Sequence, residues 1–208
     1  MASLDEIDVS LNITPNILEQ IWKGTKLKSN DKVIGFYRQY GKPYGCFSNF
    51  YLHKQIIFTV PDFCWTEIMR SSGLPQSVPI DFSEKSIMLC KASLMGDPIS
   101  YQMIIESSDP KHTKGLGRKI KPWNQQKWDK YVCKIAKEVV RQKFSQLDTE
   151  RDVLFSTGDN ILAEATKNDC IWGIGLDESN ANINDPSKWR GKNILGWALM
   201  QFREELKN

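Results

Sequence analysis

A carboxylate and an amine fall on one stripe of a helix expected over residues 84–95. At about 100° per residue, Glu84 and Lys91 share a side with Met88 and Met95, where a core helix would carry aliphatic residues. Seven residues separate the two groups by about 10 Å along the axis, which suits groups that converge on a ligand between them. The simpler alternative is that the helix dipole favours Glu84 and that Lys91 extends past the core edge.

A second candidate for chemistry is the segment Asn-Asp-Cys-Ile-Trp-Gly-Ile-Gly at 168–175. Asp169 supplies an acid, Trp172 an aromatic surface for stacking, and Gly173 allows the backbone to approach a ligand closely. An ordinary turn around a core tryptophan is the alternative interpretation. The glycine spacing does not match a dinucleotide-binding fingerprint.

Three further features predict ligand contacts. Ser48 and Asn49 stand after Phe47 and form a polar pair between aromatic residues, typical of a turn that binds a hydroxyl or phosphate, or of a capped turn. Residues 111–121 hold five Lys or Arg, including Arg118, and favour either a phosphate-binding loop or a solvated charge run. Asn193 either contacts the ligand or caps the last helix.

The elements that must position these residues are those of an α+β, mostly helical single domain with a small β-sheet. We expect strands at 33–37 and 55–60, and a loop or insert at 61–82, which contains three prolines. Ser83 is expected to cap the helix over 84–95, with its solvent face marked by Lys85, Ser86 and Ser93. Further helices are expected at 125–144, 149–155 and 161–165 and after Asn193.

The first 31 residues form a separate segment, ahead of a main domain at 32–208. Thr14 and Pro15 have the form of an N-cap followed by proline at the first helical position. The spacing of Ile17, Ile21 and Trp22 then predicts a short amphipathic helix, which we expect to pack on the main domain.

Composition limits the class of protein. The chain has 208 residues, 40% hydrophobic and 25% charged, as expected of one globular domain, and a net charge of +3 does not by itself indicate nucleic-acid binding. Five cysteines without a CxxC pair indicate reduced thiols, and two histidines leave little material for a metal site. With neither a secretory signal nor a membrane span in the sequence, we expect an intracellular protein, cytoplasmic or nuclear, with no membrane partner.

Together these pieces resemble one family. They are FSNF at 47–50, SEKSIMLCKASLMGD at 83–97, KGLGRKIKPW within 109–123, KFSQ at 143–146, LFSTGDNILAEATKNDCIWGIGL at 154–176 and GKNILGWALMQFREEL at 191–206. This ordered series is similar to the NADAR (NAD- and ADP-ribose-associated, YbiA-like) family over residues 33–206. It departs from the family in lacking an aromatic residue soon after Glu84. Residues 64–78 look like an insertion relative to short bacterial members and are a candidate lid or substrate-selecting loop.

The resemblance implies an N-glycosidase that hydrolyses a ribose C1′–N bond, without metal or cofactor. Its implied substrate is ADP-ribosylated guanine in nucleic acid, or alternatively a phosphoribosyl-amino-pyrimidine intermediate of riboflavin synthesis; a non-catalytic ADP-ribose-binding module is a third reading. The implied catalytic residues are Glu84, Lys91 and Asp169. The implied substrate-binding residues are Phe47, Ser48, Asn49, Arg118, Trp172, Gly173 and Asn193.

Overall fold

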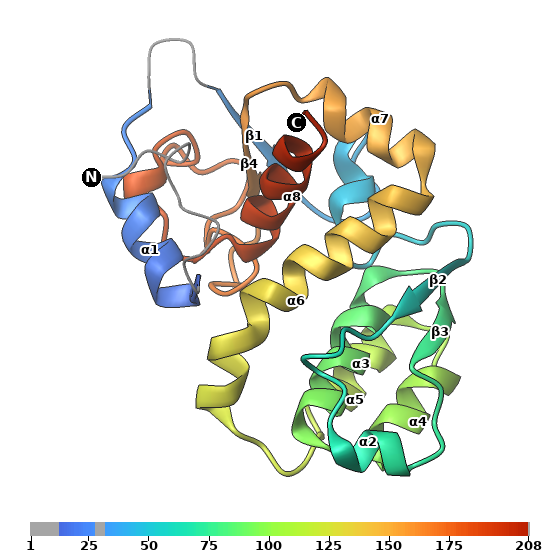
Figure 1. Ribbon diagram of the computed structural model, residues 1–208. Helices are drawn as coiled ribbons and strands as arrows, with labels where there is room; N and C mark the ends of the chain where they lie inside the picture. The colour runs from blue at the N-terminus through green and yellow to red at the C-terminus, as the bar shows by residue number, and fades with distance from the viewer. Residues whose placement is uncertain (1–12, 28–31, 208) are drawn as a thin grey trace.

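The computed structural model describes residues 13–27 and 32–207, and its fold is the α+β, mostly helical arrangement expected. Figure 1 shows the long helix α6 (Gln125–Gln146) running between two groups of elements. One group contains α1 (Pro15–Gly24), β1 (Val33–Phe36), β4 (Ile161–Glu164) and α8 (Ile194–Glu205). The other contains β2 (Ile56–Thr59), α2 (Glu67–Ser71), β3 (Ser77–Ile80), α3 (Ser83–Met95), α4 (Pro98–Glu106) and α5 (Pro110–Gly117). Three short helices complete the fold: η2 (Tyr44–Phe47), α7 (Asp148–Ser156) and η3 (Pro186–Lys188).

The helix α1 confirms the prediction for the N-terminal segment. Thr14 is its N-cap, and the threonine hydroxyl accepts a hydrogen bond from the Ile17 amide at 3.4 Å. Trp22 joins α1 to the main domain: its indole donates to the Lys192 carbonyl at 2.7 Å and its ring lies 5.2 Å from that of Trp189. The rest of the predicted extension, 1–12 and 28–31, lies outside the described residues.

The strands form two small sheets rather than one. β1 pairs with β4 in parallel, with Val33 opposite Ile161 and Phe36 opposite Glu164. β2 and β3 form an antiparallel pair in which Ile56 lies opposite Ile80. The parallel pair joins segments 128 residues apart along the chain (161 − 33), so tertiary packing rather than local sequence brings them together.

Two predicted segments were wrong, and a third was wrong in part. Residues 161–165 are the strand β4 and not a helix, because this short apolar run is buried between β1 and α8 and completes its hydrogen bonds to β1. The proline-rich stretch 61–82 contains α2 and β3 and is not a plain loop. Much of the basic stretch 111–121 is helical, as part of α5, which begins at Pro110 behind the N-cap Asp109.

The helix α3 also differs from a simple amphipathic helix. Lys85, Ser86 and Ser93, expected on a solvent face, are buried, because α4, α5, α6 and β3 all pack on α3. Two of these groups have carbonyl partners, since Ser93 donates to Cys64 and Lys85 to Ile105. The buried Ser86 hydroxyl has no hydrogen-bond partner among the described residues. Ser83 does not cap the helix, since the N-cap position is Phe82 and no side chain bonds there.

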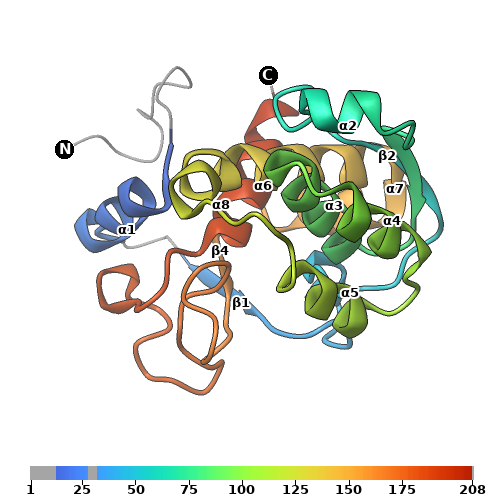
Figure 2. The same ribbon diagram turned by 90° about the horizontal axis from the view of Figure 1, so that it is seen from below.

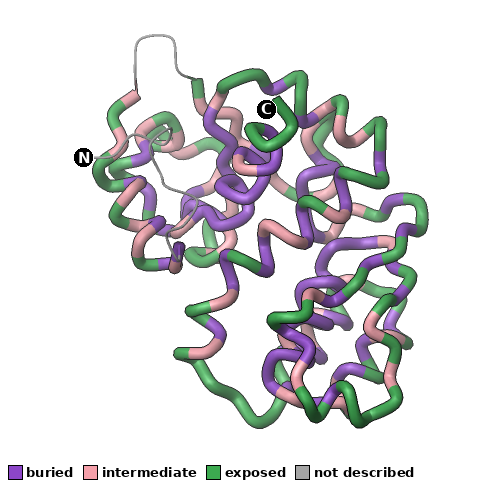
Figure 3. The backbone as a smooth tube through the Cα atoms, in the orientation of Figure 1, coloured by how far each residue is buried: buried purple, intermediate pink, exposed green. Residues whose placement is uncertain are grey.

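The helices α6 and α8 carry the core between the two groups. The apolar residues Val132, Ile135 and Phe144 of α6 are buried. The helix α8 is buried along most of its length (Figure 3).

Within the described ranges 13–27 and 32–207 no helix is long and apolar enough to cross a membrane, and no cluster of acidic, His or Cys side chains could hold a metal ion. All five cysteines are free thiols.

Candidate active site

Glu84 lies at the start of α3 with only 4% of its surface exposed. Its backbone N–H donates to the Asn49 carbonyl at 2.8 Å, which ties the start of the helix to the turn after η2. Burial raises the pKa of the Glu84 carboxyl to about 7; the charge of Asp169 acts in the same direction, and those of Lys114, Lys91 and Arg118 oppose it. A carboxyl with a pKa near neutrality can both take up and release a proton at physiological pH.

Glu164, at the end of β4, is a second carboxyl of the same site. Its Oε2 is buried and has no hydrogen-bond partner among the residues that the structure describes. Burial raises the pKa of Glu164 to about 8, the negative charges of Asp169 and Glu84 add to the effect, and Lys114 opposes it. Sequence reasoning missed this residue because it assigned 161–165 to a helix. The available signal was a lone acid in the apolar run Ile-Leu-Ala-Glu-Ala.

Side chains of α8 and its N-cap hold β4 along the edge that β1 leaves free. The Asn193 carboxamide donates to the Leu162 carbonyl at 2.8 Å and accepts from the Glu164 amide at 3.1 Å, much as a neighbouring strand would. Asn193 itself has a left-handed backbone (φ 49°), is fully buried, and makes no side-chain cap to α8. The structure therefore places this predicted ligand contact against β4, where it sets the position of Glu164.

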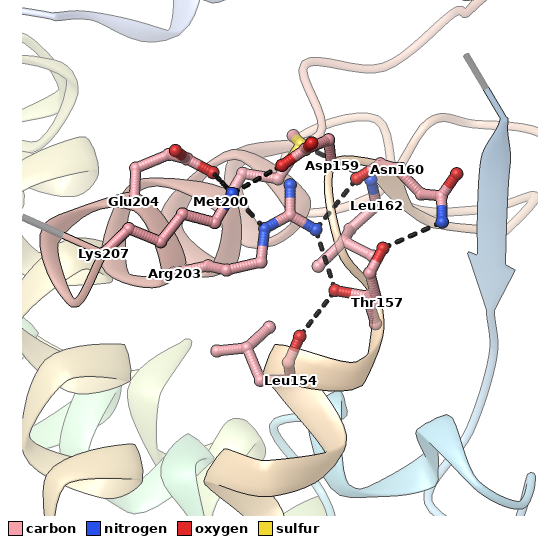
Figure 4. Close-up of polar contacts among 9 residues, drawn as sticks. All are labelled: Leu154, Thr157, Asp159, Asn160, Leu162, Met200, Arg203, Glu204 and Lys207. Atoms are coloured by element: carbon pink, nitrogen blue, oxygen red, sulfur yellow. Dashed lines mark hydrogen bonds and ion pairs between the residues drawn. The ribbon is translucent and has the colours of Figure 1, made fainter. Parts of the chain in front are cut away.

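A buried arginine secures the turn that leads into β4 (Figure 4). Arg203 donates to the Thr157 hydroxyl at 2.8 Å and to the Asn160 carbonyl at 3.0 Å, and the Leu162 amide contacts the Met200 sulfur at 3.4 Å. The helix α8 thus fixes both the start and the end of β4.

Asp169 and Trp172 belong to a tight turn that packs on the end of β4. One carboxylate oxygen of Asp169 accepts from the amides of Ile171 and Trp172, at 3.0 and 2.8 Å. Gly173 is buried here, and a Cβ on it would lie 2.7 Å from the Glu164 carbonyl oxygen. Glycine is therefore required for the turn to approach β4, and both Asp169 and Trp172 remain half-buried.

The basic groups come from α3 and α5. The Lys91 ammonium donates to the Gly117 carbonyl at 2.7 Å and lies 4.5 Å from the Trp123 ring centre. Burial lowers its pKa, the charge of Arg118 adds to this, and Glu84 opposes it. Arg118 is exposed at the C-terminal end of α5. Lys114, half-buried on α5, acts on both carboxyls; the sequence had marked its segment without singling it out.

The turn after η2 contributes backbone as much as side chains. Phe47 points into the core, where its ring lies 5.4 Å from Phe36 and 6.2 Å from Phe144. Ser48 accepts a hydrogen bond from the Phe50 amide at 3.2 Å, and both Ser48 and Asn49 are buried. Of the sequence-predicted groups, the structure thus brings Glu84, Lys91, Arg118 and Asp169 into one electrostatic cluster. Figure 2 shows α5 and the loop after β4 on the same side of the molecule.

Comparison with known proteins identifies the family. The NADAR domain model matches residues 35–207. The chain belongs to the NADAR family. This NADAR domain is 42% identical to N-glycosidase R617 of Acanthamoeba polyphaga mimivirus over 124 residues, 59% of this chain and 72% of the relative. It is 29% identical to N-glycosidase Npun_R5314 of Nostoc punctiforme over 175 residues, 84% of this chain and 93% of the relative.

A solved structure supports the same assignment. The NMR structure of the E. coli protein YbiA superposes on this NADAR domain with a TM-score of 0.62 and 25% sequence identity, covering 89% of this chain and 90% of YbiA. The two small sheets and the helices around them therefore form the YbiA fold, and the cluster around Glu84 is built on that framework.

Proposed function

We propose that this NADAR-family N-glycosidase removes ADP-ribose from ADP-ribosylated guanine in nucleic acid, by hydrolysing the bond between the ribose C1′ and a guanine nitrogen. The observation that carries the proposal is the pair of buried carboxyls, Glu84 and Glu164, whose pKa values are raised to about 7 and about 8 beside basic groups of α3 and α5. Glycoside hydrolysis needs one acid and one base, and the two pKa values divide these roles.

In the proposed reaction Glu84, ionised, takes a proton from a water molecule that adds to C1′. Glu164, protonated, gives its proton to the departing guanine nitrogen as the C1′–N bond breaks. The products are free ADP-ribose and unmodified guanine, and exchange with solvent returns the proton from Glu84 to Glu164. Asp169 would stabilise the positive ribose of the transition state through its negative charge.

Substrate binding is assigned to the groups around this pair. Arg118 and Lys114 would neutralise phosphate, which carries the negative charge that both side chains attract. Trp172 would stack on a base, a contact worth about 1–3 kcal/mol on nucleobase platforms. Ser48 and Asn49 would contact ribose hydroxyls from the turn beside Glu84.

A covalent route through Lys91 is the second candidate, and its lowered pKa favours it. After the ribose ring opens, the Lys91 amine would attack C1′ and displace the guanine nitrogen, giving a Schiff base that water later hydrolyses to aldehyde and amine. In the structure the amine donates to Gly117 and would have to leave that carbonyl to react.

The direct test is to incubate the protein with an oligonucleotide carrying ADP-ribosyl-guanine and to follow release of ADP-ribose by mass spectrometry. Wild type, Glu84→Gln and the exposed control Glu178→Gln are run together. Release by wild type and E178Q, but not by E84Q, is the expected result. Release by all three would remove Glu84 from the chemistry and make Asp169 the next candidate.

The alternatives give different results in the same experiment. No release from the oligonucleotide, with turnover of a phosphoribosyl-amino-pyrimidine, would assign the protein to riboflavin intermediates. Tight binding of the modified oligonucleotide without release of ADP-ribose would favour a non-catalytic binding module.

A further inference from the structure

Lys143, a buried lysine with no role in the proposed chemistry, contacts the backbone of the turn that carries Ser48 and Asn49. Lys143, in the last turns of α6, has only 3% of its surface exposed. Among the described residues, no carboxylate lies within ion-pair distance of its ammonium. A buried, unpaired cation is costly and is seldom found unless it has a specific task.

The ammonium of Lys143 is held by backbone carbonyls instead. It donates to the Cys46 carbonyl at 2.6 Å and to the Ser48 carbonyl at 3.4 Å, across 97 and 95 residues of sequence. The rings of Tyr51 and Phe144 lie 5.6 and 5.2 Å from the ammonium. Burial lowers the pKa of Lys143 to about 8, while Cys46 and Glu150 act in the opposite direction.

These carbonyls lie at the end of η2 and lead directly to the candidate active site. The Ser48 carbonyl also accepts from the Tyr51 amide at 3.2 Å, and the next carbonyl along the chain, that of Asn49, accepts from the Glu84 amide at 2.8 Å. An amine that bridges two carbonyls fixes the path of the backbone between them, since both must point at one atom. The Lys143 ammonium thus fixes the turn that presents Ser48 and Asn49.

We infer that Lys143 is a positioning residue of the active site: its ammonium fixes the turn at 46–49 and, through the Asn49 carbonyl, the start of the helix that carries Glu84. The inference deepens the proposed function, because it assigns a role at the same site. It does not require Lys143 to touch the substrate. The charges that act most on the pKa of Glu84 are those of Lys114, Asp169, Lys91 and Arg118, so the effect of Lys143 should be geometric.

The first test needs no substrate. Amide hydrogen exchange is compared in wild type, Lys143→Met and the control Lys134→Met, an exposed lysine on the same helix. K143M is expected to speed exchange at the amides of Tyr51 and Glu84 by about tenfold or more, while amides in α8 keep their protection. K134M should leave all of them unchanged. A folded K143M with wild-type protection at Tyr51 and Glu84 would overturn the inference.

The second test uses the glycosidase assay. K143M is expected to raise KM by about tenfold through loss of a charged hydrogen bond, and to leave the apparent pKa of the activity profile unchanged. In the double variant with Ser48→Ala, KM should rise by less than the product of the two single-variant fold-changes. A rise equal to that product, or a shift in the pH profile of the activity, would overturn the positioning role.

The two tests also distinguish misfolding of K143M, and failure of the proposed function, from failure of the positioning role. If K143M does not fold, Lys143→Gln, which keeps N–H donors on a shorter chain, is measured with the same two readouts and is expected to show the same local effects. If wild type turns over no substrate while K143M shows faster exchange at Tyr51 and Glu84, the proposed function fails and the positioning of the turn stands.

Discussion

Replacing Glu84 by Gln is expected to stabilise the folded protein at alkaline pH while abolishing activity. Burial raises the pKa of Glu84 from 4.5 to about 7, so the folded protein binds this proton more tightly than the unfolded chain does. The free energy of unfolding therefore falls as the pH rises from about 4.5 to about 7, and stays lower by a constant amount above that. At about 1.36 kcal/mol for each pH unit, the gap is worth about 3 kcal/mol.

The assay is unfolding of wild type and E84Q in urea at about pH 4 and about pH 9. The stability advantage of E84Q over wild type should grow by about 3 kcal/mol between the two conditions, or by about 6–12 °C in Tm. Any offset from lost contacts is common to both pH values and cancels. Because the charge of Glu84 also raises the pKa of Glu164, E84Q should lower the pKa of Glu164, which adds to the stability advantage of the variant at high pH.

The control is Glu178→Gln, which removes an exposed carboxyl and should show no growth of this kind. If the difference between E84Q and wild type stays constant from about pH 4 to about pH 9, Glu84 does not ionise at a cost in the folded protein. The reasoning from burial would then be refuted, and with it the basis for assigning Glu84 the base role.

Four further outcomes are expected. Activity should peak between about pH 7 and 8, where Glu84 is ionised and Glu164 is protonated. Glu164→Gln should lower kcat by about 10²–10⁴-fold and abolish the decline in activity above pH 8; a decline that persists in this variant would contradict the acid role of Glu164. Borohydride added during turnover should trap a covalent adduct that is lost in Lys91→Ala, and no adduct in wild type would exclude the Schiff base. Raising salt should increase KM more than it lowers kcat, less so in Arg118→Ala; a salt-independent KM would argue against phosphate binding there. Gly117→Ala should cost about 1–3 kcal/mol in urea unfolding, because its Cβ would lie 1.8 Å from the Met88 sulfur; unchanged stability would show that α5 and α3 separate easily.

The sequence by itself determined the features that depend on local pattern. Helical spacing of apolar residues predicted α6 and α8, and Thr14 with Pro15 predicted the start of α1, because capping and amphipathic burial act within a few residues. Glu84 was predicted as a site residue because a core helix normally carries aliphatic residues on its apolar stripe, and a carboxylate there needs another explanation whichever elements pack on the helix. The motif resemblance then predicted the family, which the match over residues 35–207 confirms.

Only the tertiary structure decided the features that depend on distant partners. Ile161–Glu164 has no local signal that separates strand from helix, and it is a strand because β1 offers a parallel edge and α8 covers the other side. Glu164 becomes a site residue only through that placement. Lys143 shows the same limit: a charge on a helix usually points to solvent, and its burial becomes visible only when the turn at 46–49 supplies the carbonyls that receive it.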